Sequence, residues 1–269
     1  MPLNSKVARF MHKEHPVFKK PADENAKIWR YMDFTQFVSL IDRQALFFTR
    51  TNCLDDKFEG TLSKHVFDPL VEEQATEEQR QQLQKVREQS SIGAKFFREW
   101  TFVNCWHMNE YESAAMWKLH LKSDEGVAIQ STYRRLADSF KKDDPTEIWI
   151  GTVNYIDYER EHIPIENGMY PFIYKRKSFE HEKELRAVIW YRPQPQPVST
   201  SNGSVYRVRD CDILLNGFQV PVDLERLVET VYVSPTAQDW FEDLVKSVMT
   251  KYDCGMNVTK SSLADDPIF

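Results

Sequence analysis

Residues 102–120 have the sequence FVNCWHMNEYESAAMWKLH, in which a strand-forming segment leads directly into a helix-forming one. The first part, Phe102 to Trp106, is mostly apolar or aromatic and favours a strand. Asn109 then precedes Glu112 by three residues, which is the spacing of a helix cap, and apolar residues follow at helical spacing. Unpaired amides at a helix start often face a ligand. The segment therefore predicts a core strand and helix with a candidate site at their junction.

A purely structural role fits the same residues. In that interpretation Trp106, Met116 and Trp117 belong to the core and Glu112 only caps the helix. The pattern by itself does not separate a core element from a core element that also carries a site.

The composition is that of an ordinary globular protein. The chain has 269 residues, of which 41% are hydrophobic and 28% charged, enough for one large domain or two small ones. The net charge of -6 argues against a general nucleic-acid binder. No run has the length of a membrane span, and the first residues carry no apolar signal region. We therefore expect a cytoplasmic protein without a membrane partner.

The cysteine pattern predicts free thiols. The four cysteines are far apart in the sequence and form no C-x-x-C pair, so a zinc knuckle is not expected. A reducing compartment would keep them from pairing. The residues concerned are Cys53, Cys105, Cys211 and Cys254.

The order of the predicted elements indicates an α+β fold. Residues 1–25 are polar and contain three prolines, which predicts a loosely held arm. Residues 26–269 are expected to form a single domain with a mixed, curved sheet flanked by helices, from which a polar helical stretch near 63–98 departs. Strands are predicted at 27–32, 45–49, 102–106, 125–132, 147–158, 187–191, 205–208, 217–222, 227–233 and 257–263.

Several local expectations follow from helix and strand signals. Asp33 and Gln36 should cap a helix. Ser234-Pro235 should start the last helix, whose core face is predicted as Trp240, Leu244, Val245 and Val248. The proline-rich 193–197 should be a surface connection, and the strands at 205–208 and 217–222 should pair.

An arginine between aromatic residues is the first candidate for ligand binding. Arg30 lies between Trp29 and Tyr31 on a predicted strand. A guanidinium there can grip a phosphate or carboxylate while the rings cover it. Alternatively, Arg30 pairs with a nearby acid such as Asp55 or Glu59.

Two further segments place polar groups at strand ends. Ser131 and Thr132 end one predicted strand. Glu182, Glu184 and Arg186 enter another, and strand alternation puts all three on one face. Two carboxylates and an arginine on one face either pair with one another or serve a ligand.

An acidic loop precedes Gly60. Its carboxylates, Asp55, Asp56 and Glu59, could hold a cation or steady an arginine. Alternatively, the aspartates bond to their own backbone in a turn.

Taken in chain order, Arg30, Ser131 and Glu182-x-Glu184 resemble the Arg-Ser-Glu pattern of ADP-ribosyltransferases. The resemblance implies that fold type and NAD as the cofactor. It further implies that Glu184 stabilises the oxocarbenium-like centre as nicotinamide leaves and that Glu182 assists; a carboxylate lowers the energy of such a centre. The implied cofactor-binding residues are Arg30, Tyr31, Ser131 and Thr132.

Over residues 27–263 the chain also resembles an uncharacterised bacterial domain family, whose relatives include proteins named for abortive phage resistance. The family often has Pro where this chain has Lys57. The resemblance implies a shared fold and a phage-defence setting, without an established activity. It is carried by Arg30-Tyr31, Phe48 to Gly60, Cys105-Trp106, Ser113 to Trp117, Glu182-x-Glu184-x-Arg186 and Ser262-Leu263.

Three classes of function remain open. The favoured one is a nucleotide- or NAD-binding transferase of ADP-ribosyltransferase-like type, without a metal, whose macromolecular acceptor the sequence does not identify. The second is a metal-dependent phosphoesterase or nuclease, in which scattered carboxylates hold Mg²⁺. The third is a non-enzymatic sensor or interaction module, built on the 13% of aromatic residues. We expect the transferase residues to converge with the 109–112 junction around one cleft, and the other cleft candidates are Asp55, Asp56, Glu59, Asn109, Glu112 and Arg186.

Overall fold

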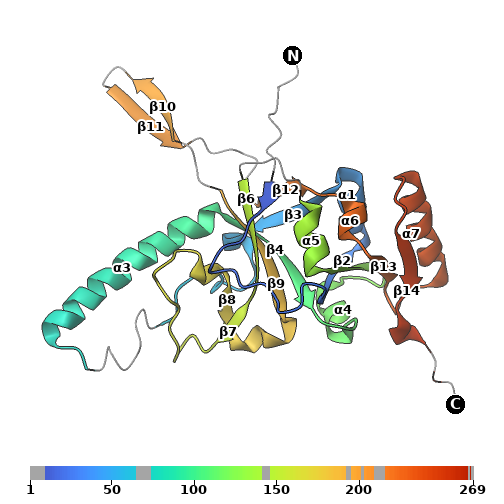
Figure 1. The fold of residues 1–269 in the computed structure, drawn as a ribbon, viewed down its shortest axis with the longest axis horizontal. Helices are drawn as coiled ribbons and strands as arrows, with labels where there is room; N and C mark the ends of the chain where they lie inside the picture. Colours follow the sequence, from blue (N-terminus) through green and yellow to red (C-terminus); the bar gives the residue numbers. More distant parts are fainter. Residues whose placement is uncertain are drawn as a thin grey trace.

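The computed structural model describes residues 10–64, 74–140, 146–191, 195–200, 203–208, 216–265 and 267. A ten-stranded mixed sheet forms its centre, and helices flank the sheet (Figure 1). The expected α+β class and the mixed sheet are confirmed.

The main path through the sheet is β1-β6-β9-β4-β2-β5-β13-β14, and β3 joins β12 to β4. The pairs β1–β6 and β13–β14 are parallel, and the other pairs are antiparallel. The strands of this sheet are β1 (Phe10–His12), β2 (Lys27–Asp33), β3 (Ala45–Arg50), β4 (Thr101–Met108), β5 (Gly126–Thr132), β6 (Thr146–Thr152), β9 (Glu184–Trp190), β12 (Gly217–Pro221), β13 (Thr230–Val233) and β14 (Asn257–Lys260).

Two smaller sheets and the helices complete the fold. β7 (Asn154–Ile156) pairs with β8 (Tyr174–Arg176), and β10 (Pro195–Thr200) pairs with β11 (Gly203–Val208). The α-helices are α1 (Phe34–Arg43), α3 (Glu77–Trp100), α4 (Ala114–His120), α5 (Tyr133–Ser139), α6 (Leu224–Leu227) and α7 (Asp239–Lys251). The short 3-10 turns are η1 (Thr51–Cys53), η2 (Tyr170–Phe172), η3 (Lys177–Glu182) and η5 (Ser262–Ala264).

Strand β9 separates two layers of apolar side chains. Leu185 and Ala187 enter the main core, which α1, α5, α6 and α7 cover. Val188 faces the other way, into a cluster with Trp149 and Phe172. Since successive side chains point to opposite faces, Glu184 and Arg186 lie on the same face as Val188. The polar end of β9 therefore faces away from the main core.

One edge of β4 is shared between two strands, and this divides the sheet. β2 pairs with β4 only at residues 107 and 108, whereas β3 pairs with β4 only at residues 102 and 103. Neither strand pairs with residues 104–106 on that edge. β2 and β3 therefore diverge here, and we call the opening between them the fork. One side chain of β4 bridges the fork: Asn104 Nδ2 donates to the Phe47 carbonyl of β3 at 2.9 Å.

The connection between the arms of the fork forms as the sequence predicts. Helix α1 joins β2 to β3, and Gln36 at its start accepts a hydrogen bond from the Asp33 amide at 3.2 Å. Its buried face, Phe37, Leu40 and Ile41, belongs to the main core. The predicted capping pair is thus confirmed.

The segment expected to be a loose arm contributes to the fold from residue 10 onward. β1 pairs with β6, and Val17 and Phe18 are buried. Phe18 stacks on Trp149 with ring centroids 5.6 Å apart. Two apolar residues among lysines and prolines carry this contact, which is too short a pattern to predict an element. Residues 1–9 lie outside the described part of the chain.

Two predicted helix starts are wrong. α4 begins after Ser113, whose Oγ accepts from the Met116 amide at 3.3 Å, and not after Asn109. α7 begins at Asp239, because the residues from Ser234 onward form a separate turn in which the Ala237 amide bonds to the Ser234 carbonyl. In both places a turn precedes the helix and carries the polar residues that had predicted the start.

The core face of α7 is also rotated from its expected position. Trp240 is 53% exposed, whereas Phe241 is fully buried. Val245 and Met249 continue the buried stripe at spacings of four. One residue corresponds to about 100° of rotation around the helix axis. Rotating the buried face by one residue therefore places Phe241 in the core and leaves the Trp240 indole exposed.

Strand partners in the last third of the chain also differ from those expected. The segment 203–208 pairs with β10, and 217–221 pairs with β3. The prolines of 195–197 lie in a two-stranded ribbon, where each strand has an outer edge that needs no donor. The expected strand 147–158 is interrupted at Val153 and continues as β7 in another sheet.

Helix α3 occupies the later part of the region near 63–98 where a polar helical stretch was expected, and residues 65–73 of that region lie outside the described residues. It has 24 residues, none of them buried, and it extends away from the sheet (Figure 1). Among all the residues that the structure describes, no helix has both the length and the apolar character needed to cross a membrane.

Candidate functional site

A cavity of about 760 Å³ lies at the fork, within the size range of small-molecule sites. Its walls come from β2, α1, β3, the loop after β3, β4, α4, β8, η3 and β9. Its ionisable and polar lining includes Arg30, Tyr31, Asp55, Asp56, Glu59, His107, His120, Lys175, Glu182 and Glu184.

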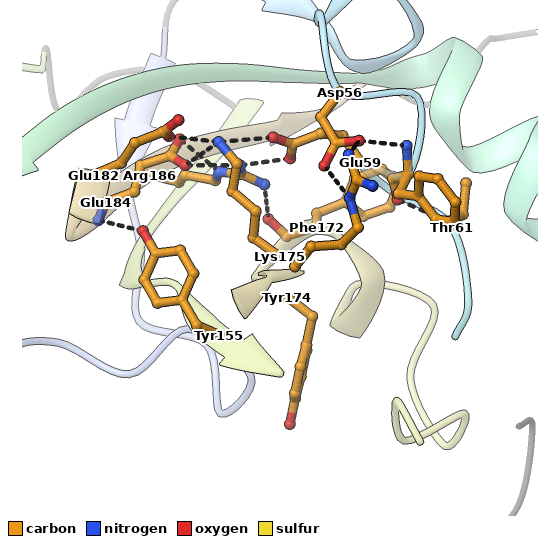
Figure 2. Close-up of polar contacts among 12 residues, drawn as sticks. Asp56, Glu59, Thr61, Tyr155, Phe172, Tyr174, Lys175, Glu182, Glu184 and Arg186 are labelled. Atoms are coloured by element: carbon orange, nitrogen blue, oxygen red, sulfur yellow. Dashed lines mark hydrogen bonds and ion pairs between the residues drawn. The ribbon is translucent and has the colours of Figure 1, made fainter. Parts of the chain in front are cut away.

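The ammonium of Lys175 lies among three carboxylates. Its Nζ is 2.5 Å from Glu182 Oε2, 3.0 Å from Glu59 Oε1 and 3.3 Å from Glu184 Oε2 (Figure 2). Lys175 is buried. Burial opposes its charge, but Glu184 and Glu59 outweigh that effect and raise the pKa of Lys175. Lys175 is therefore a fixed cation.

Arg186 holds the same cluster from the strand side. Its Nε lies 2.8 Å from Glu184 Oε1, and its Nη2 lies 2.9 Å from Glu184 Oε2 and 2.5 Å from Glu59 Oε2. Nη1 donates to the Phe172 carbonyl at 2.9 Å. The guanidinium is 1% exposed. A buried charge requires such complete pairing.

Glu182 reaches the cluster by a route that strand alternation did not predict. It is the last residue of η3, and Lys183 connects this 3-10 turn to the first residue of β9, Glu184. Lys183 has φ 40°, in the left-handed region. This turn, and not a shared strand face, brings Glu182 to Lys175. The predicted single face for Glu182, Glu184 and Arg186 is therefore wrong for Glu182.

The carboxylates of Glu182 and Glu184 have different electrostatic surroundings. Burial opposes the charge of Glu184, but Arg186 and Lys175 hold its pKa at about 2. Burial raises the pKa of Glu182, although Lys175 acts against it. The Glu182 side chain is 19% exposed, compared with 5% for Glu184. Two neighbouring carboxylates with opposed pKa shifts are typical of acid–base sites.

A second ion pair closes the rim of the cavity. Arg176 donates to both carboxylate oxygens of Asp56, at 2.8 and 3.2 Å. Its guanidinium stacks on the Phe58 ring, 4.4 Å from the centroid. The acidic loop therefore steadies an arginine, one of the roles expected for it, and lies against β8. Asp56 Oδ1 also accepts from the Phe58 amide at 3.1 Å, as the alternative of an aspartate turn predicts.

Arg30 lies at the opening of the fork. By alternation it shares a face with Ile28 and Met32, which enter the main core. Its Nη1 instead donates to the Cys105 carbonyl at 2.7 Å, on the free edge of β4. That is its one hydrogen bond among the residues with described placement, and it has no ion pair there. Arg30 therefore retains donors for a ligand.

Ser131 and Thr132 lie away from the cavity. Ser131 is fully buried, and its hydroxyl donates to the Leu227 carbonyl at 2.5 Å. Thr132 Oγ1 accepts from the Arg135 amide at 3.2 Å and caps α5. Neither belongs to the cavity lining, so the expected convergence does not extend to them.

The 109–112 junction likewise serves the fold. Glu112 accepts from the Trp117 indole at 3.0 Å and from the Ser262 amide at 3.0 Å, which ties α4 to the end of the chain. Asn109 donates to the Tyr111 carbonyl at 2.8 Å. Neither Asn109 nor Glu112 lines the cavity. Tyr31 does line it, and its hydroxyl accepts from the Ser113 amide at 2.7 Å.

Three cavity residues that are important below, Lys175, His107 and His120, were not among the predicted site residues. Lys175 had a weak signal as part of a run of three cations. His107 lies on β4 with the parity of Val103, so the strand itself predicts that it faces the site side. His120, at the end of α4, had no signal, because only the packing of α4 brings it here.

Cys105 and Cys254 are free thiols, the Cys53 Sγ lies 3.4 Å from the Asn52 side-chain oxygen, and Cys211 lies outside the described residues. Burial raises the pKa of the Cys105 thiol. Within the described ranges no group of three or more histidines, cysteines and acids could hold a metal ion.

No protein family matches this chain, and neither the curated proteins nor the solved structures contain a significant match.

Proposed function

We propose that this protein binds an NAD-type nucleotide at the fork and cleaves its glycosidic bond, with ADP-ribosyltransferase-like chemistry. The observation that supports this most is that Arg30 and the Glu182–Glu184 pair line one cavity. They come from segments about 150 residues apart in the sequence, so their convergence is a property of the fold. An arginine for phosphate and a carboxylate for a sugar cation are the two groups this reaction needs.

Arg30 would bind the phosphates. Its bond to the Cys105 carbonyl orients the guanidinium and leaves its other nitrogens for an anion. Bidentate contacts of arginine with phosphate are strong and directional. The aromatic residues beside it in the cavity, Trp29 and Tyr31, supply flat surfaces for a base or ring.

Glu182 would be the carboxylate that acts on the sugar, and Glu184 would position it. This exchanges the roles that the resemblance implied. Both oxygens of Glu184 are engaged by Arg186 and its side chain is 5% exposed. Among the described residues the Glu182 carboxylate pairs with Lys175 alone, and its side chain is 19% exposed. The raised pKa of Glu182 also suits a group that accepts a proton.

The reaction can be written with these groups. The bond between the ribose C1′ and the nicotinamide nitrogen breaks, and its electron pair leaves with nicotinamide. The Glu182 carboxylate stabilises the positive charge that develops on the sugar. Water or an acceptor hydroxyl then bonds to C1′, and its proton passes to Glu182.

A metal-dependent phosphoesterase has less support. Its candidate ligands already have partners: Asp56 bonds to Arg176, and Glu59 bonds to Lys175 and Arg186. A metal would have to displace these cations. A binding module without turnover stays open, and the same cavity would then hold a nucleotide without cleaving it. Phage defence is the setting we propose, on the family resemblance alone.

The test is release of nicotinamide from NAD by the wild-type chain and by Glu182→Gln. We expect the variant to lose activity by a factor of about 10²–10⁴, the usual contribution of a general base. Glu180→Gln is the matched control, because Glu180 lies in the same turn and is exposed. Equal rates in the wild type and Glu182→Gln, or no release by the wild type, would refute the proposal.

A further inference from the structure

Besides the carboxylate cluster, the cavity has a group of nitrogen-bearing side chains around Tyr31. His107 and His120 each have ring centroids 6.4 Å from that of Tyr31. The His120 ring is nearly parallel to it, with an interplanar angle of 9°. Arg30, the neighbour of Tyr31 on β2, lines the same cavity. Three basic side chains from β2, β4 and α4 therefore line one cavity, and two of them lie beside the Tyr31 ring.

The hydrogen bond of His107 shows which of its ring nitrogens carries a hydrogen. Its Nδ1 lies 2.6 Å from the backbone carbonyl oxygen of Glu182. A carbonyl only accepts, so Nδ1 carries the hydrogen. The Nε2 is buried and has no partner within the described ranges, and the residue is 7% exposed. A buried nitrogen without a hydrogen-bond partner costs free energy. A ligand atom that bonds to His107 Nε2 would remove this cost.

The surroundings keep both histidines neutral when no ligand is present. His120 keeps an exposed side, but the cavity wall partly desolvates its ring and lowers its pKa, and Arg30 and His107 lower it further. Burial also lowers the pKa of His107, against the effect of the Glu182 carbonyl. The other charged or titratable groups that act on the two rings are Lys175, His181, Lys183 and Glu184. Of these only Glu184 is an acid, and Arg186 already neutralises it.

We propose that Arg30, His107 and His120 form a diphosphate subsite, which takes up protons when a nucleotide diphosphate binds. The inference rests on the proposed function for the identity of the ligand and assigns one part of that ligand to named residues. An anion beside the three groups supplies a negative charge opposite the two rings. Each protonated ring then gains a charge-assisted bond to phosphate.

The sign of the pH effect follows from the two states. In the free protein the histidines protonate only below their ordinary value of 6.5. A bound diphosphate raises both pKa values, since an opposite charge favours the charged form. At pH values between the pKa values of the free and the bound protein, the histidines take up protons when the ligand binds. Affinity therefore increases as the pH falls from 8 to 6.

The experiment is calorimetric titration of the full chain with ADP-ribose at pH 8 and pH 6. Both phosphates of ADP-ribose are esterified, so the charge of the diphosphate stays constant over this range. We expect affinity on the order of tenfold higher at pH 6, equivalent to a coupling of one pKa unit. Buffers of different ionisation enthalpy should report net proton uptake. Equal affinity at both pH values without proton uptake would overturn the inference.

Variants locate the effect. His120→Gln should lose most of the pH dependence, and its exposed position makes loss of folding a small concern. His162→Gln is the control, because His162 is exposed and outside the cavity lining; it should keep the wild-type dependence. Adenosine, which has no phosphate, should bind without pH dependence. If His120→Gln keeps the full dependence, the assignment is wrong.

The outcome can be separated from that of the proposed reaction. ADP-ribose has no nicotinamide, so its binding requires no cleavage. Proton-linked binding of ADP-ribose without nicotinamide release from NAD would support the subsite and refute the enzyme. Glu182-dependent release with pH-independent binding of ADP-ribose would refute the subsite and leave the enzyme intact.

Discussion

Arg186 binds Glu184 through two hydrogen bonds, from Nε to Oε1 at 2.8 Å and from Nη2 to Oε2 at 2.9 Å. The two residues lie on one face of β9, and both are buried. Glu59 and Lys175 join the pair from the acidic loop and from β8. The ion pair thus connects three segments that surround the cavity, and its strength should be visible in the stability of the whole domain.

Replacing Arg186 should destabilise the fold. Arg186→Met leaves Glu59 and Glu184 buried with Lys175 as their shared cation, and loss of one partner from a buried pair costs about 3–5 kcal/mol. Urea denaturation measures the free energy of unfolding. Arg134→Met is the matched control, since Arg134 forms an exposed pair with Glu24 and is 59% exposed; its effect should be within about 1 kcal/mol. Equal losses in the two variants would contradict the structure.

Stability should also fall in acid through Glu184. Its pKa is lowered to about 2 in the folded chain, from an ordinary value of 4.5. A lowered pKa stabilises the fold above the unfolded value, and this contribution is lost as the pH falls from about 4.5 to 2. The loss should be on the order of 3 kcal/mol. Glu184→Gln should be less stable at neutral pH and should have a flatter pH profile over that range; a parallel profile would count against the pairing.

Trp117 should be a core residue. It is a residue of α4 and is 3% exposed, and its ring centroid lies 5.0 Å from that of Tyr31 on β2. Trp117→Ala should cost about 3–5 kcal/mol of unfolding free energy. Trp240→Ala provides the same substitution at a site that is 53% exposed, and it should cost much less. Thermal melts of both variants compare the two losses of stability. An unchanged melting temperature for Trp117→Ala would show that its indole is not part of the core.

Periodicity predicted the central elements because their apolar residues are numerous and regular. β4, β5 and α1 form close to the expected positions, and the polar α3 departs from the body as expected. Short signals failed where a turn intervened. The Asn109 cap lies in a turn before α4, and the expected start at Ser234 is a turn before α7. Strand partners could not be predicted either, since pairing of 217–221 with β3 joins segments about 170 residues apart.

The candidate site was predicted in part for a similar reason. Arg30, Glu182 and Glu184 are charges beside strands, an uncommon position that the sequence displays directly. Ser131 has the same sequence signal, yet its hydroxyl bonds to the Leu227 carbonyl. His120 reaches the cavity only through the docking of α4, which no local pattern specifies. The sequence thus displays which groups are unusual, and tertiary packing decides which of them meet.

The central claim is that the fork binds a nucleotide through Arg30, and calorimetric titration of ADP-ribose into wild type and Arg30→Gln tests it most directly. Gln keeps a donor for the Cys105 carbonyl, so the fold should persist, and Arg134→Gln serves as the surface control. We predict saturable binding to the wild type and to Arg134→Gln, and affinity lower by about tenfold or more in Arg30→Gln, the loss of one charge-assisted contact. No binding to the wild type, or equal affinities for wild type and Arg30→Gln, would contradict the account.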